Sequence, residues 1–180
     1  MRFYTGRGDD GTTDLLGARV GKDDARVEVL GALDETSSAI GMARALASDA
    51  RVRADLVDVQ RDLYRIMAEF AFTAELRPAS YELAADRVGW LEAESNALAA
   101  AVELPAEFIL PGESVPGATL DVARTVARRA ERQVVALAHA GHEVNANILG
   151  YLNRLSSLLF IAARVEDNAA GGEVMRAKGR

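Results

Sequence analysis

Three arginines and a glutamate recur at helical spacing between residues 120 and 135. Arg124, Arg128 and Arg132 stand four residues apart, and Glu131 directly precedes the last of them. On an α-helix, with about 100° between successive residues, these four side chains share one stripe. A guanidinium group presents planar donors that match phosphate oxygens two at a time, whereas stacked cations repel one another unless an anion or acidic group neutralises them. The stripe therefore indicates either a site for a small anion or a solvated charged face.

The first 24 residues are rich in groups that suit a phosphate ligand, and we expect them to form a loop. Glycines allow a ligand to approach the backbone closely, threonines supply hydroxyl groups, and Arg7 and Lys22 supply positive charge. The segment from Gly6 to Thr12 superficially matches a P-loop, but Thr12 stands where that motif requires lysine, and too few residues precede Gly6 for its strand. We therefore exclude a P-loop, and the segment is either a ligand-binding loop or a plain flexible arm.

Asp34 is a carboxylate at an unexpected position in the helix that we expect from residue 26 to residue 48. It falls on the same face as Val27 and Leu30. A carboxylate on an apolar face is costly unless it is paired, and an arginine of the same subunit or of a neighbouring one would pair it. Otherwise Asp34 lies at the edge of the buried stripe and is solvated.

Apolar residues repeat with helical periodicity in five segments. The expected helices span residues 26–48, 51–76, 80–102, 120–135 and 146–166. Mostly short connections favour an all-α, five-helix up-and-down bundle in a single domain that covers residues 1–180. Within it we assign residues 1–24 to the N-terminal loop, residues 25–168 to the bundle and residues 169–180 to a flexible tail.

One connection, from Glu103 to Val115, is longer than the others and contains the apolar run Phe108-Ile109-Leu110. Apolar residues in a loop usually fold back onto the core. The alternative is an apolar surface presented to a ligand or a partner.

Composition and charge exclude several classes of protein. The chain has 180 residues, a formal net charge of −6 and no cysteine. The negative charge argues against a general nucleic-acid-binding protein, and the absence of cysteine excludes a thiolate metal site. A ferritin-like di-metal bundle is excluded because neither His139 nor His142 has a glutamate three residues before it. Since no run of 18 apolar residues and no apolar leader is found, we expect a cytoplasmic protein that does not enter a membrane.

Six sequence blocks, in order, resemble a known family along nearly the whole chain. They are Tyr4-Thr5-Gly6-Arg7-Gly8-Asp9-Asp10-Gly11-Thr12-Thr13, Arg19-Val20-Gly21-Lys22-Asp23-Asp24, Gly31-Ala32-Leu33-Asp34-Glu35, Phe108-Ile109-Leu110-Pro111-Gly112, Ala123-Arg124-Thr125-Val126-Ala127-Arg128-Arg129-Ala130-Glu131-Arg132 and Tyr151-Leu152-Asn153-Arg154-Leu155-Ser156. In these blocks the chain is similar to corrinoid adenosyltransferases of the propanediol-utilisation type, the ATP:cob(I)alamin adenosyltransferases. The resemblance implies a homotrimer of five-helix bundles, with an extended N-terminal nucleotide-binding loop and active sites between adjacent subunits.

The resemblance also implies roles for individual residues. Those implied in ATP binding are Thr5, Gly6, Arg7, Gly8, Thr12, Thr13, Asp14, Lys22, Arg128, Glu131, Arg132 and Asn153. Arg124 resembles the arginine that pairs across the subunit interface with the aspartate at position 34. Phe108 resembles the aromatic residue that closes the lower face of the corrin ring. The implied catalytic set is therefore Phe108, Arg128, Asp34 and Arg124.

One block departs from the family pattern. Many members have threonine, arginine or lysine, threonine, glycine and aspartate near the start, where this chain has Thr5-Gly6-Arg7-Gly8-Asp9. The cation is shifted by one place and one hydroxyl group is lost, while Arg7 can still reach a phosphate.

The implied reaction transfers the 5′-deoxyadenosyl group of ATP to the cobalt of cob(I)alamin and releases triphosphate. Because Co(I) is itself the nucleophile, the protein needs only to align the reactants and to stabilise the leaving polyphosphate. The resemblance further implies Mg²⁺ on the phosphates with no metal site built by the protein. A reductase or flavin system would donate the electron for cob(II)alamin, and an adenosylcobalamin-dependent enzyme would accept the product. The alternative is a non-catalytic corrinoid carrier or chaperone on the same bundle.

Overall fold

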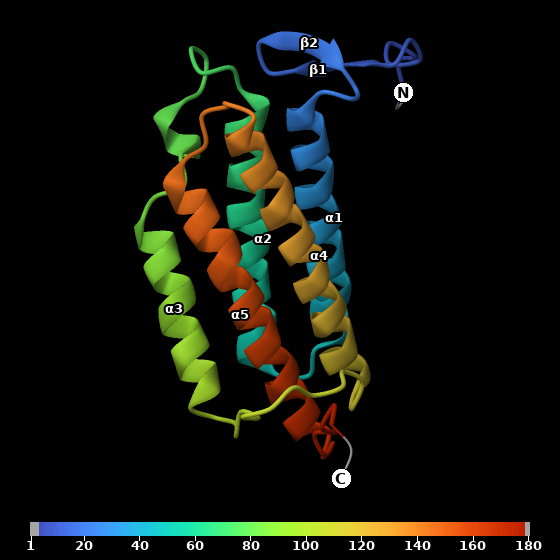
Figure 1. Cartoon of the computed structure of the whole chain (residues 1–180), viewed down its shortest axis with the longest axis vertical. Helices are drawn as coiled ribbons and strands as arrows, with labels where there is room; N and C mark the ends of the chain where they lie inside the picture. The colour runs from blue at the N-terminus through green and yellow to red at the C-terminus, as the bar shows by residue number, and fades with distance from the viewer. Residues whose placement is uncertain (1–3, 179–180) are drawn as a thin grey trace.

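The computed structural model describes residues 4–178 of the chain, and within this range it contains five α-helices, a 3₁₀ helix and a two-stranded sheet. The elements are β1 (Thr12–Leu15), β2 (Ala18–Gly21), α1 (Ala25–Leu46), α2 (Ala50–Ala71), η1 (Ala79–Tyr81), α3 (Asp86–Ala99), α4 (Val115–His139) and α5 (Ala146–Ala169). The helices run alternately down and up the long axis (Figure 1). The expected five-helix up-and-down bundle is confirmed and the fold is mainly helical, with the β1–β2 hairpin as a small two-stranded sheet that the all-α prediction did not include.

The core lies where the helices face one another. α4 packs against α1 and α5, α2 packs against α1, and α3 packs against α5. The fully buried positions of α4 follow the expected apolar face: Leu120, Ala123, Ala127, Ala130, Val134 and Leu137. α5 is long and apolar enough by composition to cross a membrane, but most of it is buried inside the bundle, as befits a core helix.

The hairpin corrects the prediction that residues 1–24 form a loop throughout. β1 and β2 pair antiparallel, and Gly17 provides the positive φ, 107°, that their two-residue turn requires. The Leu16 backbone in this turn accepts from Thr73 N at 3.0 Å and donates to Ala71 O at 2.9 Å. This docking ends α2 at Ala71, five residues before the expected end at residue 76.

The other helix boundaries also differ from expectation for local reasons. α4 begins at Val115 rather than at residue 120, because the Ser114 hydroxyl accepts from Gly117 N at 2.9 Å and Pro116 suits the first turn. α3 begins at Asp86, after η1 has taken up part of the segment expected to be helical. α4 and α5 both continue past their expected ends, to His139 and Ala169.

Buried carboxylates accept hydrogen bonds that hold the inter-helix connections against the bundle. Glu166 of α5 is fully buried and accepts three hydrogen bonds from the α1–α2 connection, from Ser48 N and Asp49 N at 2.9 Å and from the Ser48 hydroxyl at 2.6 Å. These donors satisfy a carboxylate that burial alone would strongly destabilise.

A second buried carboxylate, Asp62 of α2, ties α3 and α5 together. It accepts from the Tyr151 hydroxyl at 2.9 Å and from Arg87 Nε at 2.8 Å. Arg87 in turn lies over the Trp90 ring, 4.2 Å from its centroid. Burial, followed by the charge of Asp62, raises the pKa of the Tyr151 hydroxyl well above its ordinary value.

Asp55 of α2 is a buried carboxylate that is not fully hydrogen-bonded. Its Oδ2 atom has no hydrogen-bond partner among residues 4–178, and the same holds for the hydroxyl of Ser95 on α3. Burial and the nearby negative charge of Glu94 raise the pKa of Asp55 from 3.8 to about 6, against the opposing effect of Arg51. Ionised Asp55 therefore destabilises the folded chain.

We predict that Asp55→Asn raises the free energy of unfolding by about 1–2 kcal/mol at pH 7 to 8 and has little effect at pH 4. The stability associated with protonated Asp55 is complete below pH 3.8, its ordinary pKa, and is lost as the pH rises through about 6 in the wild-type chain. Urea unfolding at each pH measures the difference. Glu75→Gln, which changes an exposed carboxylate that does not contribute to the shift of Asp55, is the control and should show no such pH dependence. A stability gain that is equal at pH 4 and pH 8 would contradict the explanation.

Candidate functional site

The N-terminal segment before β1 forms a compact turn around a lysine. Lys22 Nζ donates to Gly8 O at 2.8 Å, and Lys22 N donates to Gly11 O at 2.8 Å. Gly6 and Gly11 have φ values of 72° and 82°, which a side chain would strain. The turn therefore holds the Lys22 ammonium group beside its backbone. The exposed Thr5 hydroxyl accepts a long hydrogen bond from Arg7 N at 3.4 Å.

Arg19, which the sequence did not single out, organises the same turn. Its guanidinium donates to Asp14 Oδ1 at 2.8 Å and to Arg7 O at 2.5 Å, and it lies 3.5 Å from Asp10. The Thr12 hydroxyl donates to Asp10 at 2.6 Å; hydrogen bonds from Thr12 are the main reason that the pKa of Asp10 is lowered. Among the cations of this segment, Arg19 therefore has acidic partners, whereas Lys22 is held by a backbone carbonyl. Thr13 is half-buried in β1.

The arginine stripe of α4 faces outward from the bundle. Arg128 and Arg132 are exposed, and no carboxylate within residues 4–178 lies at ion-pair distance from either. Glu131 is half-buried and accepts from Asn153 Nδ2 of α5 at 2.9 Å. The stripe thus combines two guanidinium groups with an anchored carboxylate–amide pair, an arrangement suited to a polyphosphate.

Asp34 lies on the exposed side of α1, so its expected place on an apolar face is wrong. The buried positions of that helix include Val29, Leu33 and Ile40 instead. Among the described residues Asp34 has no ion-pair partner, and Arg124 donates within the chain to Asp121 Oδ1 at 2.9 Å. The pairing of Asp34 with Arg124 of another subunit stays a prediction.

Phe108 does not fold back onto the core: 89% of its surface is exposed. It borders a cavity of about 410 Å³ between the 103–114 connection, α4 and α5. The lining is Ala106, Glu107, Phe108, Ile109, Pro111, Asp121, Arg124, Phe160 and Arg164. Of the two alternatives, the structure favours an apolar side chain presented outward.

The C-terminal segment holds the backbone of Phe108, although we expected residues 169–180 to be a flexible tail. Leu110 N donates to Met175 O, and Ala177 N donates to Phe108 O, both at 2.8 Å. These bonds form an antiparallel bridge between Ile109 and Arg176. The tail prediction is therefore corrected over the residues that make this bridge; residues 179 and 180 lie outside the described range.

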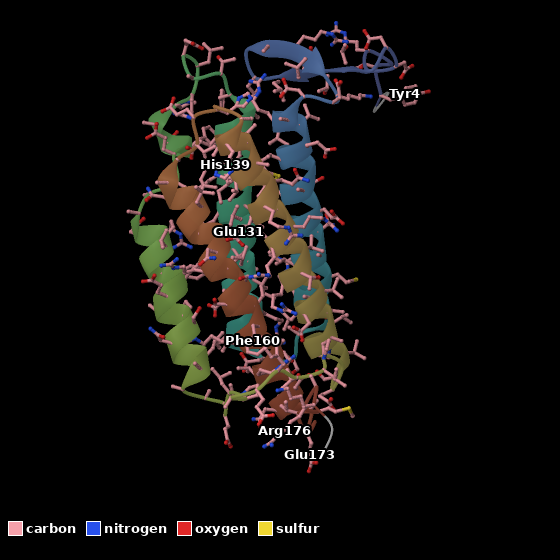
Figure 2. All side chains as sticks on the ribbon, in the orientation of Figure 1. Tyr4, Glu131, His139, Phe160, Glu173 and Arg176 are labelled. Atoms are coloured by element: carbon pink, nitrogen blue, oxygen red, sulfur yellow. The ribbon has the colours of Figure 1, made fainter. Side chains whose placement is uncertain are left out.

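One chain brings only some of the expected residues together. Figure 2 shows Tyr4 beyond one end of the bundle, Glu131 partway along it, and Phe160 and Arg176 toward the opposite end. The N-terminal turn and the Phe108 cavity thus lie at opposite ends of one chain, with the arginine stripe of α4 between them. The N-terminal turn therefore lies beyond the end of the bundle, whereas Glu131 of the stripe lies partway along it.

Sequence reasoning missed four side chains that shape the site: Arg19, Asp121, Phe160 and Arg164. Asp121 precedes Arg124 by three residues, a spacing that places the two side chains together on a helix and could have revealed the pair. Phe160 and Arg164 are distant from Phe108 in sequence, and only the fold brings them to its cavity. Within residues 4–178 no group of three or more histidine, aspartate or glutamate side chains could hold a metal ion.

Comparison with known proteins supports one family. Residues 3–166 match the family described as cobalamin adenosyltransferase. The chain is 40% identical over 175 residues to a corrinoid adenosyltransferase of Bacillus subtilis (strain 168), covering 95% of this chain and 89% of that protein. It is also 40% identical over 174 residues to the corrinoid adenosyltransferase PduO of Salmonella typhimurium, where the match covers 94% of this chain but only 51% of that longer protein.

A solved structure is similar over the whole fold. It is a variant of the PduO-type ATP:corrinoid adenosyltransferase from Lactobacillus reuteri complexed with cobalamin and ATP. The TM-score is 0.89 at 30% sequence identity, covering 99% of this chain and 97% of that one.

Proposed function

The chain belongs to the cobalamin adenosyltransferase family, and from this premise we propose that it transfers the 5′-deoxyadenosyl group of ATP to the cobalt of cob(I)alamin. The products are adenosylcobalamin and triphosphate. The observation that carries this proposal is the match in sequence and fold over nearly the whole chain to corrinoid adenosyltransferases, one of them complexed with cobalamin and ATP. The comparisons give no support to the alternative of a corrinoid carrier.

The residues of α4 and α5 suit the nucleotide half of the reaction. Arg128 and Arg132 are exposed without carboxylate partners among the described residues, so their donors are available to a polyphosphate. In the transfer, the electron pair of Co(I) forms the bond to C5′, and the bond from C5′ to the triphosphate oxygen breaks. Guanidinium groups stabilise the negative charge that develops on this leaving group.

Completion of the nucleotide site from a neighbouring subunit agrees with the separation of the N-terminal turn from the arginine stripe. The N-terminal segment would contribute Thr5, Gly6, Arg7, Gly8, Thr12, Thr13, Asp14 and Lys22, and the helices would contribute Arg128, Glu131 and Arg132 from α4 and Asn153 from α5. We therefore propose a homotrimer with active sites between subunits, in which Asp34 of one subunit pairs with Arg124 of the next.

Phe108 suits the corrin half of the reaction. Its exposed ring beside an apolar-edged cavity can lie against the lower face of the corrin ring and exclude water and the axial ligand. Removing an axial donor makes Co(II) easier to reduce to the nucleophilic Co(I). A separate reductase or flavin system supplies the electron, and an adenosylcobalamin-dependent enzyme accepts the product.

Mg²⁺ fits this site only as an ion that arrives with ATP. The described residues contain no metal-binding cluster, and Mg²⁺ is commonly held by substrate phosphates with one or two carboxylates. Bound in this way, Mg²⁺ would neutralise phosphate charge. Glu131, the carboxylate of the arginine stripe, is the candidate protein ligand to the ion. A cytoplasmic location suits the supply of ATP and reduced corrinoid.

The direct test mixes the protein with ATP, Mg²⁺ and chemically reduced cob(I)alamin and follows the visible spectrum. We expect conversion to a light-sensitive alkylcobalamin, with one triphosphate released for each cobalamin converted. Tight binding of ATP and corrinoid with an unchanged cob(I)alamin spectrum would instead support a carrier and would overturn the proposed activity.

Phe108→Ala should separate reduction from transfer. We predict that turnover from cob(II)alamin with a reductant falls by about tenfold or more, while ATP binding is unchanged, because the lower face of cobalt becomes accessible to a ligand. Arg128→Ala is the matched comparison: it should weaken ATP binding or slow transfer even when preformed cob(I)alamin is supplied. Normal cob(II)alamin turnover by Phe108→Ala would remove this side chain from the mechanism.

Asp34→Asn should weaken the assembly. We predict a shift from trimer toward monomer in sedimentation velocity at low micromolar concentration, since an interfacial arginine loses its charged partner. Asp58→Asn, whose carboxylate pairs with Arg61 within one helix, should leave the distribution unchanged. A fully trimeric Asp34→Asn variant would count against the pairing with Arg124.

A further inference from the structure

Arg164 of α5 is a buried cation that forms one wall of the Phe108 cavity. Only 2% of its surface is exposed. Its terminal nitrogen donates to Asp121 Oδ2 at 2.5 Å and lies 3.0 Å from Asp167 Oδ2. The guanidinium carbon also lies 5.1 Å from the centroid of the Phe160 ring, which borders the same cavity.

On one side, Arg164 fixes the position of Arg124. Asp121, 4% exposed, uses one carboxylate oxygen to accept from Arg164 and the other to accept from Arg124 Nε at 2.9 Å. The half-buried Arg124 side chain is therefore held by a carboxylate that is itself held by Arg164.

On the other side, Arg164 reaches both segments that hold Phe108. Asp167, 1% exposed, accepts from the Ser114 hydroxyl at 2.7 Å, and Ser114 ends the connection that carries Phe108. The backbone carbonyl of Asp167 accepts from Gly172 N at 2.9 Å, where the C-terminal segment begins its course toward the loop. Arg164 thus lies at the junction of the loop, the C-terminal segment and the α4 arginine.

The residues around Arg164 and Asp167 are closely packed. A β-carbon on Gly117, in the first turn of α4, would stand 2.0 Å from Asp167 Oδ1. Arg164 Nε and Asp167 Oδ2 have no hydrogen-bond partner among residues 4–178, so Arg164 and Asp167 interact as an ion pair and the network does not satisfy every polar atom that it buries. Buried ion pairs are often no more stable than apolar residues of similar volume, so stability alone is a weak account of this one.

We propose that Arg164 is a positioning residue of the adenosyltransferase reaction. Through Asp121 it fixes the orientation of the Arg124 side chain. Through Asp167 it fixes the position of the loop that carries Phe108. The inference rests on the proposed function, because the placement of Phe108 matters through the reduction of cob(II)alamin. Displacement of Phe108 should therefore impair turnover from cob(II)alamin more than transfer from preformed cob(I)alamin.

The test compares two rates in Arg164→Lys and in the charge-balanced double variant Arg164→Met with Asp121→Asn. The first rate is turnover from cob(II)alamin with a reductant, and the second is transfer from chemically preformed cob(I)alamin. We expect the ratio of the first to the second to fall by about tenfold, with the KM for ATP changed by less than about twofold. Arg87→Met is the matched control, because it removes an arginine from the Asp62 network in the α3 region, away from the cavity, and should leave the ratio unchanged.

The outcomes are distinguishable from failure of the proposed function. If the wild-type chain converts neither form of cobalamin, the proposed function itself fails. If the wild type is active and folded Arg164 variants keep its ratio, or if Arg87→Met lowers the ratio equally, the positioning role is overturned. Where the Arg164 variants do not fold, Ser114→Ala decides: it removes the hydroxyl that joins the loop to Asp167 and that also caps α4, and a ratio equal to that of the wild type overturns the proposal.

Discussion

Three charged side chains buried near the C-terminal end of α5 constrain how the chain connects its helices. Arg164, Glu166 and Asp167 follow closely along one helix, and all three are almost completely buried. Each can remain charged there only if donors or countercharges meet it in a defined geometry. Glu166 therefore fixes the α1–α2 connection, while Arg164 and Asp167 fix the start of α4. The apolar faces bring the helices together, and these charges determine how the chain passes between them.

The same constraint explains how a bundle of ordinary helices supports a demanding site. The helices supply rigid positions: the arginines stand on α4, and Asn153 on α5 holds Glu131 between them. The loops supply the parts that we propose to contact the ligands, namely the N-terminal turn around Lys22 and the connection that exposes Phe108. Both loops are held by other parts of the chain. Arg19 holds the N-terminal turn, and the C-terminal segment holds the connection that carries Phe108.

Periodicity predicted the part of the structure that depends on local pattern. The number of helices, the buried face of α4 and the outward direction of its arginines all follow from a repeat of 3.6 residues. The hairpin was missed because its turn is hydrogen-bonded through Leu16 to the end of α2, a contact that no local pattern reveals. Asp34 was placed on the wrong face because Val27 and Leu30 are themselves only half-buried, so they marked the edge of the apolar face and not its centre. Arg164 and Phe160 were missed because the fold alone brings them to Phe108, and the hold of the C-terminal segment on the loop was missed for the same reason.

The bridge between Ile109 and Arg176 has a consequence for the order of events during synthesis. A ribosome releases the Phe108 loop well before it releases the residues that pair with it, and α4 and α5 emerge in between. The helices can therefore begin to pack on the nascent chain, whereas the loop reaches its final hydrogen bonding only after translation has passed residue 177. A polypeptide that stalls or is cleaved late in α5 would retain most of its hydrophobic core while the loop that carries Phe108 remained unanchored.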